Sequence, residues 1–419
     1  MSKKRLEQLE KNEIYASYQA ELAFEKELNI LRNDFYYQMI DSKSTSLVDF
    51  MYRPLDTLSG DAYSARRIDM DRTFYLLIDG MGKGVSASFT TVIITAFINH
   101  LIDQMVQYDS FSLDILIQES MKFIRPILLD DEVLAIDYIC FDNKHRILEY
   151  AKFAMPPFLL QDKQDNIIRI KSNNAPLSKW NSTYTVDRYN VHNIEKFLFY
   201  SDGIVENSTK DDGLSYAAFI EDDFRESFTR EEFKEKFFAK ITEQEDDLSL
   251  IFINSLDLRK ETLLAEKSFV STLAAVESAA EWYEDIWQHL SGETRELQKA
   301  ALVFTELFMN AYEHGNLGID AKTKHRYLDE DIYFEKLSEL EKDCTKKITV
   351  AVYKLKEITS TYIVTEICDE GDGFDTQMLS QIFRNSRKFN GRGVFVSRKN
   401  SMGIYYSSKG NKVVFLNKI

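Results

Sequence analysis

The stretch at residues 306–316 reads Glu306-Leu-Phe-Met-Asn310-Ala-Tyr-Glu-His314-Gly315-Asn316. Glu306 and Asn310 are four residues apart, so a helix places both side chains on one face. On such a face an amide oxygen can hold Mg²⁺, while a carboxylate orients or deprotonates an attacking group. The stretch therefore predicts a helix that carries two polar groups suited to phosphate chemistry.

Two glycine-rich stretches follow this helix along the chain. They are Asp369-Glu-Gly371-Asp-Gly373-Phe374 and Gly391-Arg392-Gly393. Glycines let the backbone approach phosphates closely and let a loop move as a lid. The three stretches, in this order, predict a nucleotide pocket closed by a flexible lid.

In this order the three stretches resemble the N box, G1 box and G2 box of the GHKL ATPase superfamily. The likeness covers residues 261–419 and is strongest to the RsbW-like anti-sigma factors and serine kinases, in which an N box ending in His-Gly is common. It implies a Bergerat-type α/β sandwich that binds Mg-ATP, with Glu306 as the catalytic base, Asn310 as the Mg²⁺ ligand and Asp369 as the acceptor for the adenine amino group. The implied nucleotide-binding residues are Asn310, Asp369, Gly371, Gly373, Gly391, Arg392 and Gly393.

Four acidic sites lie at the ends of apolar runs between residues 59 and 247. They are Ser59-Gly60-Asp61, Ile78-Asp79-Gly80, Tyr200-Ser201-Asp202-Gly203 and Glu245-Asp246-Asp247. A single Asp-Gly pair marks a turn more often than a site, so the prediction depends on all four together. Carboxylates gathered at strand ends form an oxygen-rich cage for hard divalent cations, which can activate a bridging water against phosphorus. No His or Cys cluster with zinc spacing competes, so the predicted metal is Mn²⁺ or Mg²⁺.

These acidic sites resemble the SpoIIE/RsbU-type branch of the PPM metal-dependent serine/threonine phosphatases. The likeness implies an αββα sandwich with two metal ions, in which Asp79 is the catalytic, bridging ligand. The implied metal ligands are Asp61, Asp79, Gly80 through its carbonyl, Asp202, Asp246 and Asp247. One departure is at residues 153–157, where Phe-Ala-Met-Pro-Pro replaces the usual Ala-Gly-His-Pro-Pro, so the shape of that loop is not predicted.

The pattern of apolar residues predicts an α+β multidomain protein. Residues 1–45 are expected to be a helical linker or coiled coil, residues 46–255 the phosphatase domain, and residues 261–419 the GHKL domain. The leucines of residues 3–41 suit one long helix, which either packs on its own domain or joins two subunits as a homodimer. Strands are expected at Phe74–Ile78, Val133–Phe141, Ile147–Ala151, Phe197–Tyr200, Leu248–Ile253, Ile348–Tyr353, Tyr362–Cys368 and Lys412–Leu416. Helices are expected at Val85–Val106, Ser112–Leu128, Thr272–His289 and Glu293–Glu313, and residues 320–347 look like an insertion or a helical excursion.

Composition narrows the classes of function. The net charge of −16 argues against a general nucleic-acid-binding surface, which is normally basic. Three cysteines without a CxxC pair indicate a reduced protein. The N-terminus lacks the apolar core of a signal peptide, and the run Thr90–Leu101 is too short to span a membrane. A cytoplasmic protein without a membrane or nucleic-acid partner is therefore expected.

The two resemblances together imply a bifunctional regulator of a partner-switching pathway. Its implied partner is a STAS-domain anti-sigma factor antagonist, which the first domain would dephosphorylate at serine and the second would phosphorylate with ATP. A sigma factor or an upstream sensor protein is a further possible partner. The alternative is that the GHKL domain only binds its partner in a nucleotide-dependent manner and that the phosphatase alone is catalytic.

Overall fold

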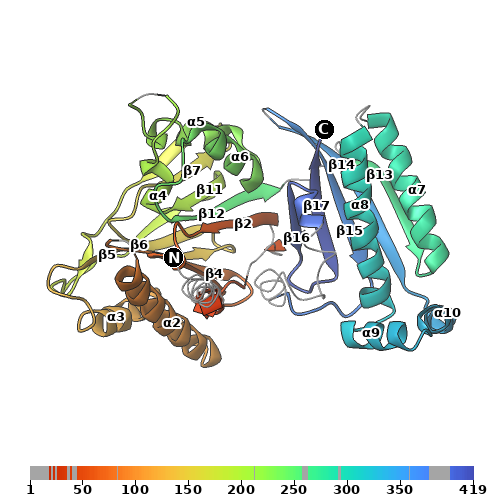
Figure 1. The fold of residues 1–419 in the computed structure, drawn as a ribbon, viewed down its shortest axis with the longest axis horizontal. Coiled ribbons are helices and arrows are strands. Elements are labelled where there is room, and N and C mark those ends of the chain that lie inside the picture. The colour runs from red at the N-terminus through yellow and green to blue at the C-terminus, as the bar shows by residue number, and fades with distance from the viewer. Residues whose placement is uncertain are drawn as a thin grey trace, which may run out of the picture. The chain divides into compact units, whose positions relative to one another are not determined.

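The structure is a computed structural model, and it divides into two compact units. Unit 1 consists of Met1–Asp34, Phe50–Arg225 and Lys236–Phe252, and unit 2 of Phe35–Asp49, Glu226–Glu235 and Ile253–Ile419. The structure describes residues 18–19, 22–23, 26–34, 38–39, 45–82, 84–211, 213–256, 263–290, 294–357, 359–376 and 397–419. Figure 1 shows the helices and strands of these parts of the chain.

Unit 1 contains an antiparallel sheet with strand order β10-β6-β5-β4-β3, and β9 pairs with β5 at one side. The strands are β3 (Asp61–Arg67), β4 (Arg72–Gly80), β5 (Val133–Asp142), β6 (Ile147–Phe153), β9 (Leu177–Ser178) and β10 (Asp187–Asn190). β4 is an almost continuous apolar run whose residues 73–78 are all buried. A strand buried on both faces is typical of a sheet covered on both sides.

A second sheet of unit 1 has the order β2-β12-β11-β7-β8. Its strands are β2 (Thr45–Arg53), β7 (Phe158–Asp162), β8 (Ile167–Ile170), β11 (Ile194–Tyr200) and β12 (Leu248–Leu256). Aromatic side chains join the two sheets: the ring centroids of Tyr75 and Phe199 are 6.2 Å apart, and those of Phe141 and Phe197 are 5.5 Å apart. The two sheets therefore pack face to face around one core.

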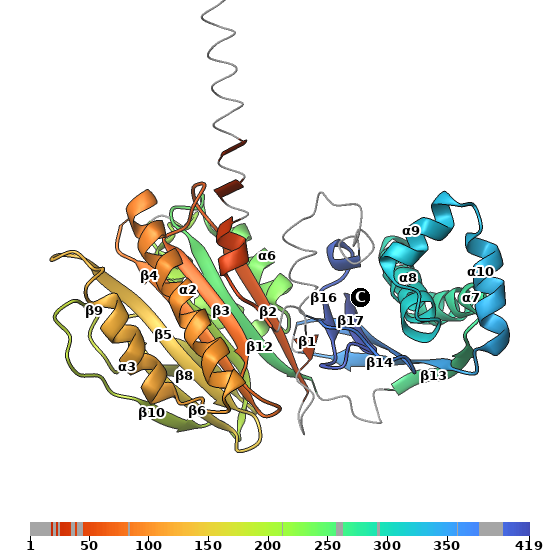
Figure 2. The same ribbon diagram turned by 90° about the horizontal axis from the view of Figure 1, so that it is seen from below.

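Helices cover the outer faces of these two sheets (Figure 2). α2 (Val85–Gln107) packs on β3 and β4, and α3 (Leu113–Ile124) packs on β5. α3 is shorter than predicted, because Pro126 cannot donate the backbone hydrogen bond that would extend it. On the second sheet, Phe224 of α5 (Ile220–Glu226) contacts Phe252 at 5.8 Å between ring centroids. The layers follow the helix–sheet–sheet–helix order that the sequence predicts.

The remaining helices near the second sheet are short. They are α4 (Asp202–Glu206), the 3₁₀ turn η1 (Tyr216–Ala218) and α6 (Arg230–Lys240). By length and composition alone, α2 is apolar enough to cross a membrane, and half of its most apolar window is buried inside the protein.

A fully buried ion pair crosses from β5 to β6. Lys152 Nζ donates to Asp137 Oδ2 at 2.8 Å and lies 4.0 Å from the ring centroid of Phe158. Both charged side chains have no exposed surface. Burial raises the pKa of Asp137 to about 6, and the ammonium of Lys152 opposes that rise.

We expect Lys152→Met to lower the free energy of unfolding by about 3–5 kcal/mol, because it leaves the Asp137 carboxylate buried without its cation. The double variant Asp137→Leu/Lys152→Met should lose much less, because both desolvated charges are gone. Scanning calorimetry, which follows the unfolding of the whole chain, measures both. Equal losses in the single and double variants would show that side-chain packing, not charge pairing, sets the cost.

Unit 2 is built on a sheet with the order β13-β14-β15-β17-β16-β1. Its strands are β1 (Gln38–Met39), β13 (Leu263–Val270), β14 (Lys347–Lys356), β15 (Thr361–Asp369), β16 (Gly403–Tyr406) and β17 (Lys412–Lys418). Pairing is antiparallel except between β1 and β16. The sequence did not predict β13, because most of its side chains are exposed and give no apolar alternation.

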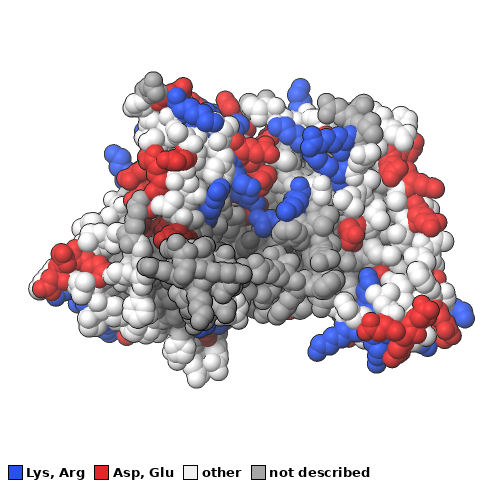
Figure 3. All heavy atoms as spheres, viewed as in Figure 1, with Lys and Arg blue, Asp and Glu red and all other residues white. Residues whose placement is uncertain are grey.

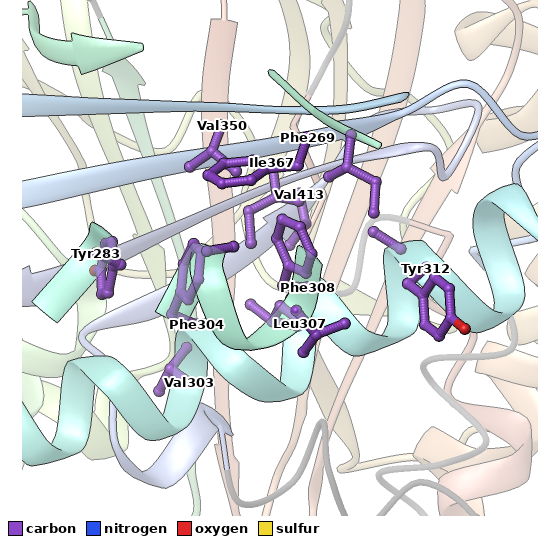
Figure 4. Close-up of a cluster of buried hydrophobic side chains, with 14 of the residues drawn as sticks. Phe269, Tyr283, Val303, Phe304, Leu307, Phe308, Tyr312, Val350, Ile367 and Val413 are labelled. Carbon is purple, nitrogen blue, oxygen red and sulfur yellow. The ribbon is translucent and has the colours of Figure 1, made fainter. Parts of the chain in front are cut away.

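Two long helices, α7 (Leu273–Leu290) and α8 (Thr294–Asn310), pack on one face of this sheet. The apolar residues of α8 recur at helical spacing, and Phe304 and Phe308 point toward β-strand residues such as Val350 and Ile367 (Figure 4). α8 continues into a π-helical turn, η3 (Ala311–Asn316). Two further helices, α9 (Ala321–Asp329) and α10 (Tyr333–Asp343), form the predicted helical excursion.

The N-terminal segment differs from the predicted helix of residues 3–41. Within the described residues, helix is present at 18–19, 22–23 and 26–30, as predicted, but Asn33 forms a bridge with Ala65 and β1 is extended. The helix cannot continue there, because residues 32–34 use their backbone groups to pair with β3. Most of the predicted coiled coil lies outside the described residues.

Candidate active sites of the two units

The acidic site of unit 1 begins at the ends of two neighbouring strands. β3 and β4 pair so that Asp61 lies directly opposite Asp79. Gly80 follows Asp79, and its backbone N–H donates to Gly60 O at 3.0 Å. Asp61 is 2 % exposed, and its Oδ2 has no hydrogen-bond partner among the described residues. Strand register therefore brings two predicted ligands, Asp61 and Asp79, to one edge of the sheet.

Uncompensated negative charge dominates this edge. Burial, together with the charges of Asp61 and Asp202, raises the pKa of Asp79 to about 10. Burial also raises the pKa of Asp61 well above its ordinary value, and the hydroxyls of Ser201 and Ser249 lower it only in part. Carboxylates held together in this way gain most from a cation placed among them.

Asp202 and the pair Asp246-Asp247 reach the same site from the second sheet. Asp202 is the first residue of α4, directly after β11, and the acidic pair directly precedes β12. A Cβ on Gly203 would overlap the backbone oxygen of Asp247, so only glycine allows α4 to lie this close. Asp247 Oδ1 accepts from Leu55 N at 2.6 Å and its Oδ2 accepts from Gly60 N at 2.7 Å. Asp247 therefore fixes the loop before Asp61, a role that the sequence did not predict.

Gly203→Ala is expected to lower divalent-cation affinity by about 10- to 100-fold, because the added Cβ pushes α4 and Asp202 away from Asp247. The effect is measured by calorimetric titration with Mn²⁺. Gly213→Ala is the matched control, since a Cβ there meets no atom within 4 Å. The control residue has a φ of +83°, so its cost is backbone strain without a clash. Equal loss of Mn²⁺ affinity in both variants would contradict this prediction.

These residues fit a divalent metal by donor chemistry. The donors are carboxylate and carbonyl oxygens, which Mg²⁺ and Mn²⁺ prefer, and the orphaned Asp61 Oδ2 is a buried acceptor in need of a positive partner. No three of the described His, Cys, Asp and Glu side chains are already placed around one ion position. Asp202 and Asp246 are half-buried, and both lie close enough to Asp79 for their charges to raise its pKa.

The loop at residues 153–157 contains one residue with an unusual backbone conformation. Ala154 has a φ of +58°, a conformation that favours glycine. Met155, which follows it, is 2 % exposed, and its carbonyl oxygen accepts from Ser172 Oγ at 2.9 Å. The alanine thus adopts the left-handed conformation, and the methionine fills a buried position.

In unit 2, Asp369 lies at the end of β15 against the π-helical turn. A Cβ on Gly315 would lie within 2.7 Å of the Asp369 carboxyl atoms, so this glycine lets the turn approach that side chain. Gly371 N donates to Asp369 Oδ1 at 2.8 Å. Burial raises the pKa of Asp369 from its ordinary value. The predicted second stretch therefore meets the first stretch at Gly315.

Glu306 and Asn310 lie about one turn apart on α8, and both side chains are half-buried. Their intervening neighbours Leu307 and Phe308 are fully packed in the core, so the polar pair flanks the face that packs on the sheet. The π-helical turn that follows is a rare element that is frequent at functional sites. His314, in this turn, makes a local hydrogen bond with the carbonyl oxygen of Ile319.

Residues near β17 support Asp369 and were not predicted. Asn411 Nδ2 donates to Asp369 O at 3.1 Å, and Lys409 Nζ donates to Gly371 O at 3.1 Å. Gly373 has a φ of +79° and lies against the Lys409 backbone. The predicted lid residues Gly391, Arg392 and Gly393 lie outside the described residues.

Comparison with known protein families finds a match for one part of the chain. Residues 69–255 match the family described as Stage II sporulation protein E (SpoIIE). This range is less than half of the 419-residue chain, and most of it belongs to unit 1. The match is therefore a likeness of this part of the chain to the SpoIIE family. No curated protein matches the chain.

Several solved structures are similar at low identity. The RsbU and RsbW domains of a Mycobacterium tuberculosis protein match with a TM-score of 0.45 and 13% identity, covering 92% of this chain and 96% of that one. The SiaA-PP2C domain of Pseudomonas aeruginosa matches with a TM-score of 0.43 and 19% identity, covering 50% and 86%. The PP2C phosphatase domain of SpoIIE from Bacillus subtilis, with a fragment of its regulatory domain, matches with a TM-score of 0.40 and 15% identity, covering 50% and 63%. These values are too low to assign an activity.

Proposed function

We propose that unit 1 is a metal-dependent phosphoserine phosphatase. The observation that carries the proposal is the register of β3 and β4, which places Asp61 opposite Asp79 beside Asp202 and the pair Asp246-Asp247. Buried carboxylates without a compensating charge are better explained as a site for a divalent cation than as part of a structural turn. The SpoIIE match over residues 69–255 supports the same function.

The residues of this chain would divide the work of such a site. Asp61, Asp79, Asp202, Asp246, Asp247 and the Gly80 carbonyl would hold two Mn²⁺ or Mg²⁺ ions, with Asp79 between them. When bound, these ions supply Lewis acidity and a water that is deprotonated near neutral pH. Asp247 additionally holds the loop before Asp61 through the amides of Leu55 and Gly60. The protein thus fixes the donors, and their buried setting strengthens the attraction between each carboxylate and a cation.

We propose that unit 2 binds Mg-ATP as a GHKL-type domain and phosphorylates serine. The approach of Gly315 to Asp369 supports a base-binding carboxylate at the end of β15. The half-buried Glu306 and Asn310 on α8 supply a base and a Mg²⁺ ligand one turn apart. Gly391, Arg392 and Gly393 would close the nucleotide pocket.

The proposed pathway role is partner switching in the cytoplasm. A STAS-domain anti-sigma factor antagonist would be dephosphorylated by unit 1 and phosphorylated by unit 2, and the chain would act as a homodimer under an upstream sensor.

Cys140, Cys344 and Cys368 are free, as suits a reducing compartment. On the face drawn in Figure 3, acidic side chains lie among basic ones, which with a net charge of −16 does not favour nucleic acid. If unit 2 transfers no phosphate, it is a nucleotide-dependent binding module for the same partner or a sigma factor.

The experiment uses the full chain and a phosphoserine STAS-domain protein. Phosphate release with Mn²⁺ or Mg²⁺, and its loss in EDTA, would support the phosphatase. Transfer of labelled γ-phosphate from ATP to the unphosphorylated partner would support the kinase, and nucleotide-dependent binding without transfer would support the binding module. No release with either metal, from the protein or from a phosphoserine peptide, would overturn the phosphatase proposal.

A further inference from the structure

Residues 26–34 are docked along strand β3 of unit 1. Asp34 N donates to Ala65 O at 2.7 Å, and Ala65 N donates to Arg32 O at 2.9 Å. The side chain of Asn99, on α2, donates to Ile30 O at 3.0 Å. The segment therefore lies on the strand that begins with Asp61, and backbone hydrogen bonds hold it there.

Within this segment, Glu27 is a buried carboxylate with one unpaired oxygen. Glu27 belongs to the helical residues 26–30 and is 2 % exposed. Oε1 accepts from the Tyr52 hydroxyl at 2.8 Å and from Ser59 N at 3.1 Å. Oε2 is buried and has no hydrogen-bond partner among the described residues. A buried carboxylate oxygen left unpaired is costly, so its placement needs a physical reason.

The loop at residues 54–60 is held by two carboxylates, one from each end of unit 1's sequence. Asp247 accepts from the amides of Leu55 and Gly60, and Glu27 accepts from the neighbouring amide of Ser59. Asp61 is the next residue after Gly60, so the position of this loop sets the position of Asp61. The same Tyr52 hydroxyl, whose hydrogen is closer to Glu27, also lies 3.4 Å from Asp61 O, so the Glu27 contact adjoins the ligand residue itself.

We propose that Glu27 is a positioning residue for the divalent-cation site, and that docking of residues 26–34 and cation binding are coupled through it. The proposal deepens the phosphatase function proposed for unit 1. When Glu27 is docked, the loop and Asp61 are held in place. Glu27 adds negative charge beside a group of carboxylates, so a bound cation lowers the cost of burying it. Coupling of two equilibria is reciprocal: the docked segment tightens cation binding, and the bound cation tightens docking.

The first test measures Mn²⁺ affinity of the full chain by calorimetric titration, without substrate. Glu27→Ala is expected to bind Mn²⁺ about 10- to 100-fold more weakly, which is typical when an outer-shell partner is removed. Glu27→Gln keeps an oxygen that accepts from Tyr52 and Ser59, so it should recover most of the affinity lost in Glu27→Ala. Asn29→Ala, an exposed change in the same helical turn, is the matched control and should bind as the wild type does. Wild-type affinity in Glu27→Ala would overturn the proposal.

The second test follows backbone hydrogen exchange of residues 26–34 with and without Mn²⁺. In the wild type, Mn²⁺ should slow exchange in this segment, and in Glu27→Ala it should not. A residue that only stabilises the fold would not make this exchange depend on the metal. If Glu27→Ala fails to fold, the wild-type exchange still decides: Mn²⁺-independent exchange at residues 26–34 overturns the coupling.

The two proposals can fail separately. A wild type that binds Mn²⁺ and shows metal-dependent exchange, but releases no phosphate from phosphoserine, removes the phosphatase function and keeps the role of Glu27. A wild type that releases phosphate, while Glu27→Ala keeps full Mn²⁺ affinity, removes the role of Glu27 and keeps the phosphatase.

Discussion

Asp79→Asn is expected to lower Mn²⁺-dependent hydrolysis of a phosphoserine protein by about 10³-fold or more, because the substitution removes the proposed central ligand for the divalent ions. Asp79 lies opposite Asp61, and burial with the neighbouring charges raises its pKa to about 10. An asparagine keeps the shape and one oxygen but cannot carry the charge that a shared ligand provides. Steady-state rates of phosphate release, measured over a range of Mn²⁺ concentrations, test this expectation.

The same substitution should leave the fold intact, which separates a chemical role from a structural one. Removing one of several repelling carboxylates relieves charge repulsion, so the melting temperature of Asp79→Asn should be equal to or above that of the wild type. Asp109→Asn is the matched control: Asp109 is exposed beyond the opposite end of α2 and has a φ of +48°, which asparagine tolerates. Near wild-type turnover in Asp79→Asn would remove the metal assignment.

The sequence predicted strands whose side chains are mostly buried. It missed a strand whose side chains are mostly exposed. β4 and β5 are long apolar runs, and the predicted ranges Phe74–Ile78 and Val133–Phe141 lie inside the observed strands. β13 is mostly exposed, so its role as a partner of β14 leaves no apolar pattern in the sequence. The predicted N-terminal helix is wrong at residues 32–34, because pairing with β3 is a tertiary interaction that local propensity cannot report.

In the candidate sites, too, the sequence did not predict the contacts of single residues that depend on tertiary structure. Acidic residues at strand ends predicted that carboxylates would gather, and the structure places Asp61 and Asp79 side by side. The register that joins them, and the use of both Asp247 oxygens by backbone amides, depend on pairing that spacing does not contain. Glu27 could not be found from sequence, since it looks like any other acidic residue of an amphipathic helix. The structure therefore reveals side chains that position a loop, which the sequence alone did not predict.

Glu306→Gln and Asn310→Ala are expected to separate phosphoryl transfer from nucleotide binding in unit 2. Both residues are half-buried on α8, while their neighbours Leu307 and Phe308 anchor the helix in the core, so each change should leave the fold intact. Asn310→Ala removes the proposed Mg²⁺ ligand and should weaken Mg-ATP binding itself. Glu306→Gln removes the proposed general base, so it should leave binding largely unchanged and slow phosphorylation of a STAS-domain partner by roughly 10²–10⁴-fold. Calorimetric titration with Mg-ATP and single-turnover phosphorylation measure the two effects.

Comparing these two variants distinguishes a role in catalysis from a role in nucleotide binding, because phosphoryl transfer depends mainly on positioning and on neutralising charge. Glu296→Gln, a change near the start of the same helix, is the matched control for effects on α8 alone. Equal loss of Mg-ATP affinity in Glu306→Gln and Asn310→Ala would mean that both groups serve the nucleotide and that neither acts as a base. A wild type that binds Mg-ATP but transfers nothing to a STAS-domain protein would leave unit 2 as a binding module, and its nucleotide would then control how tightly the partner of the phosphatase is held.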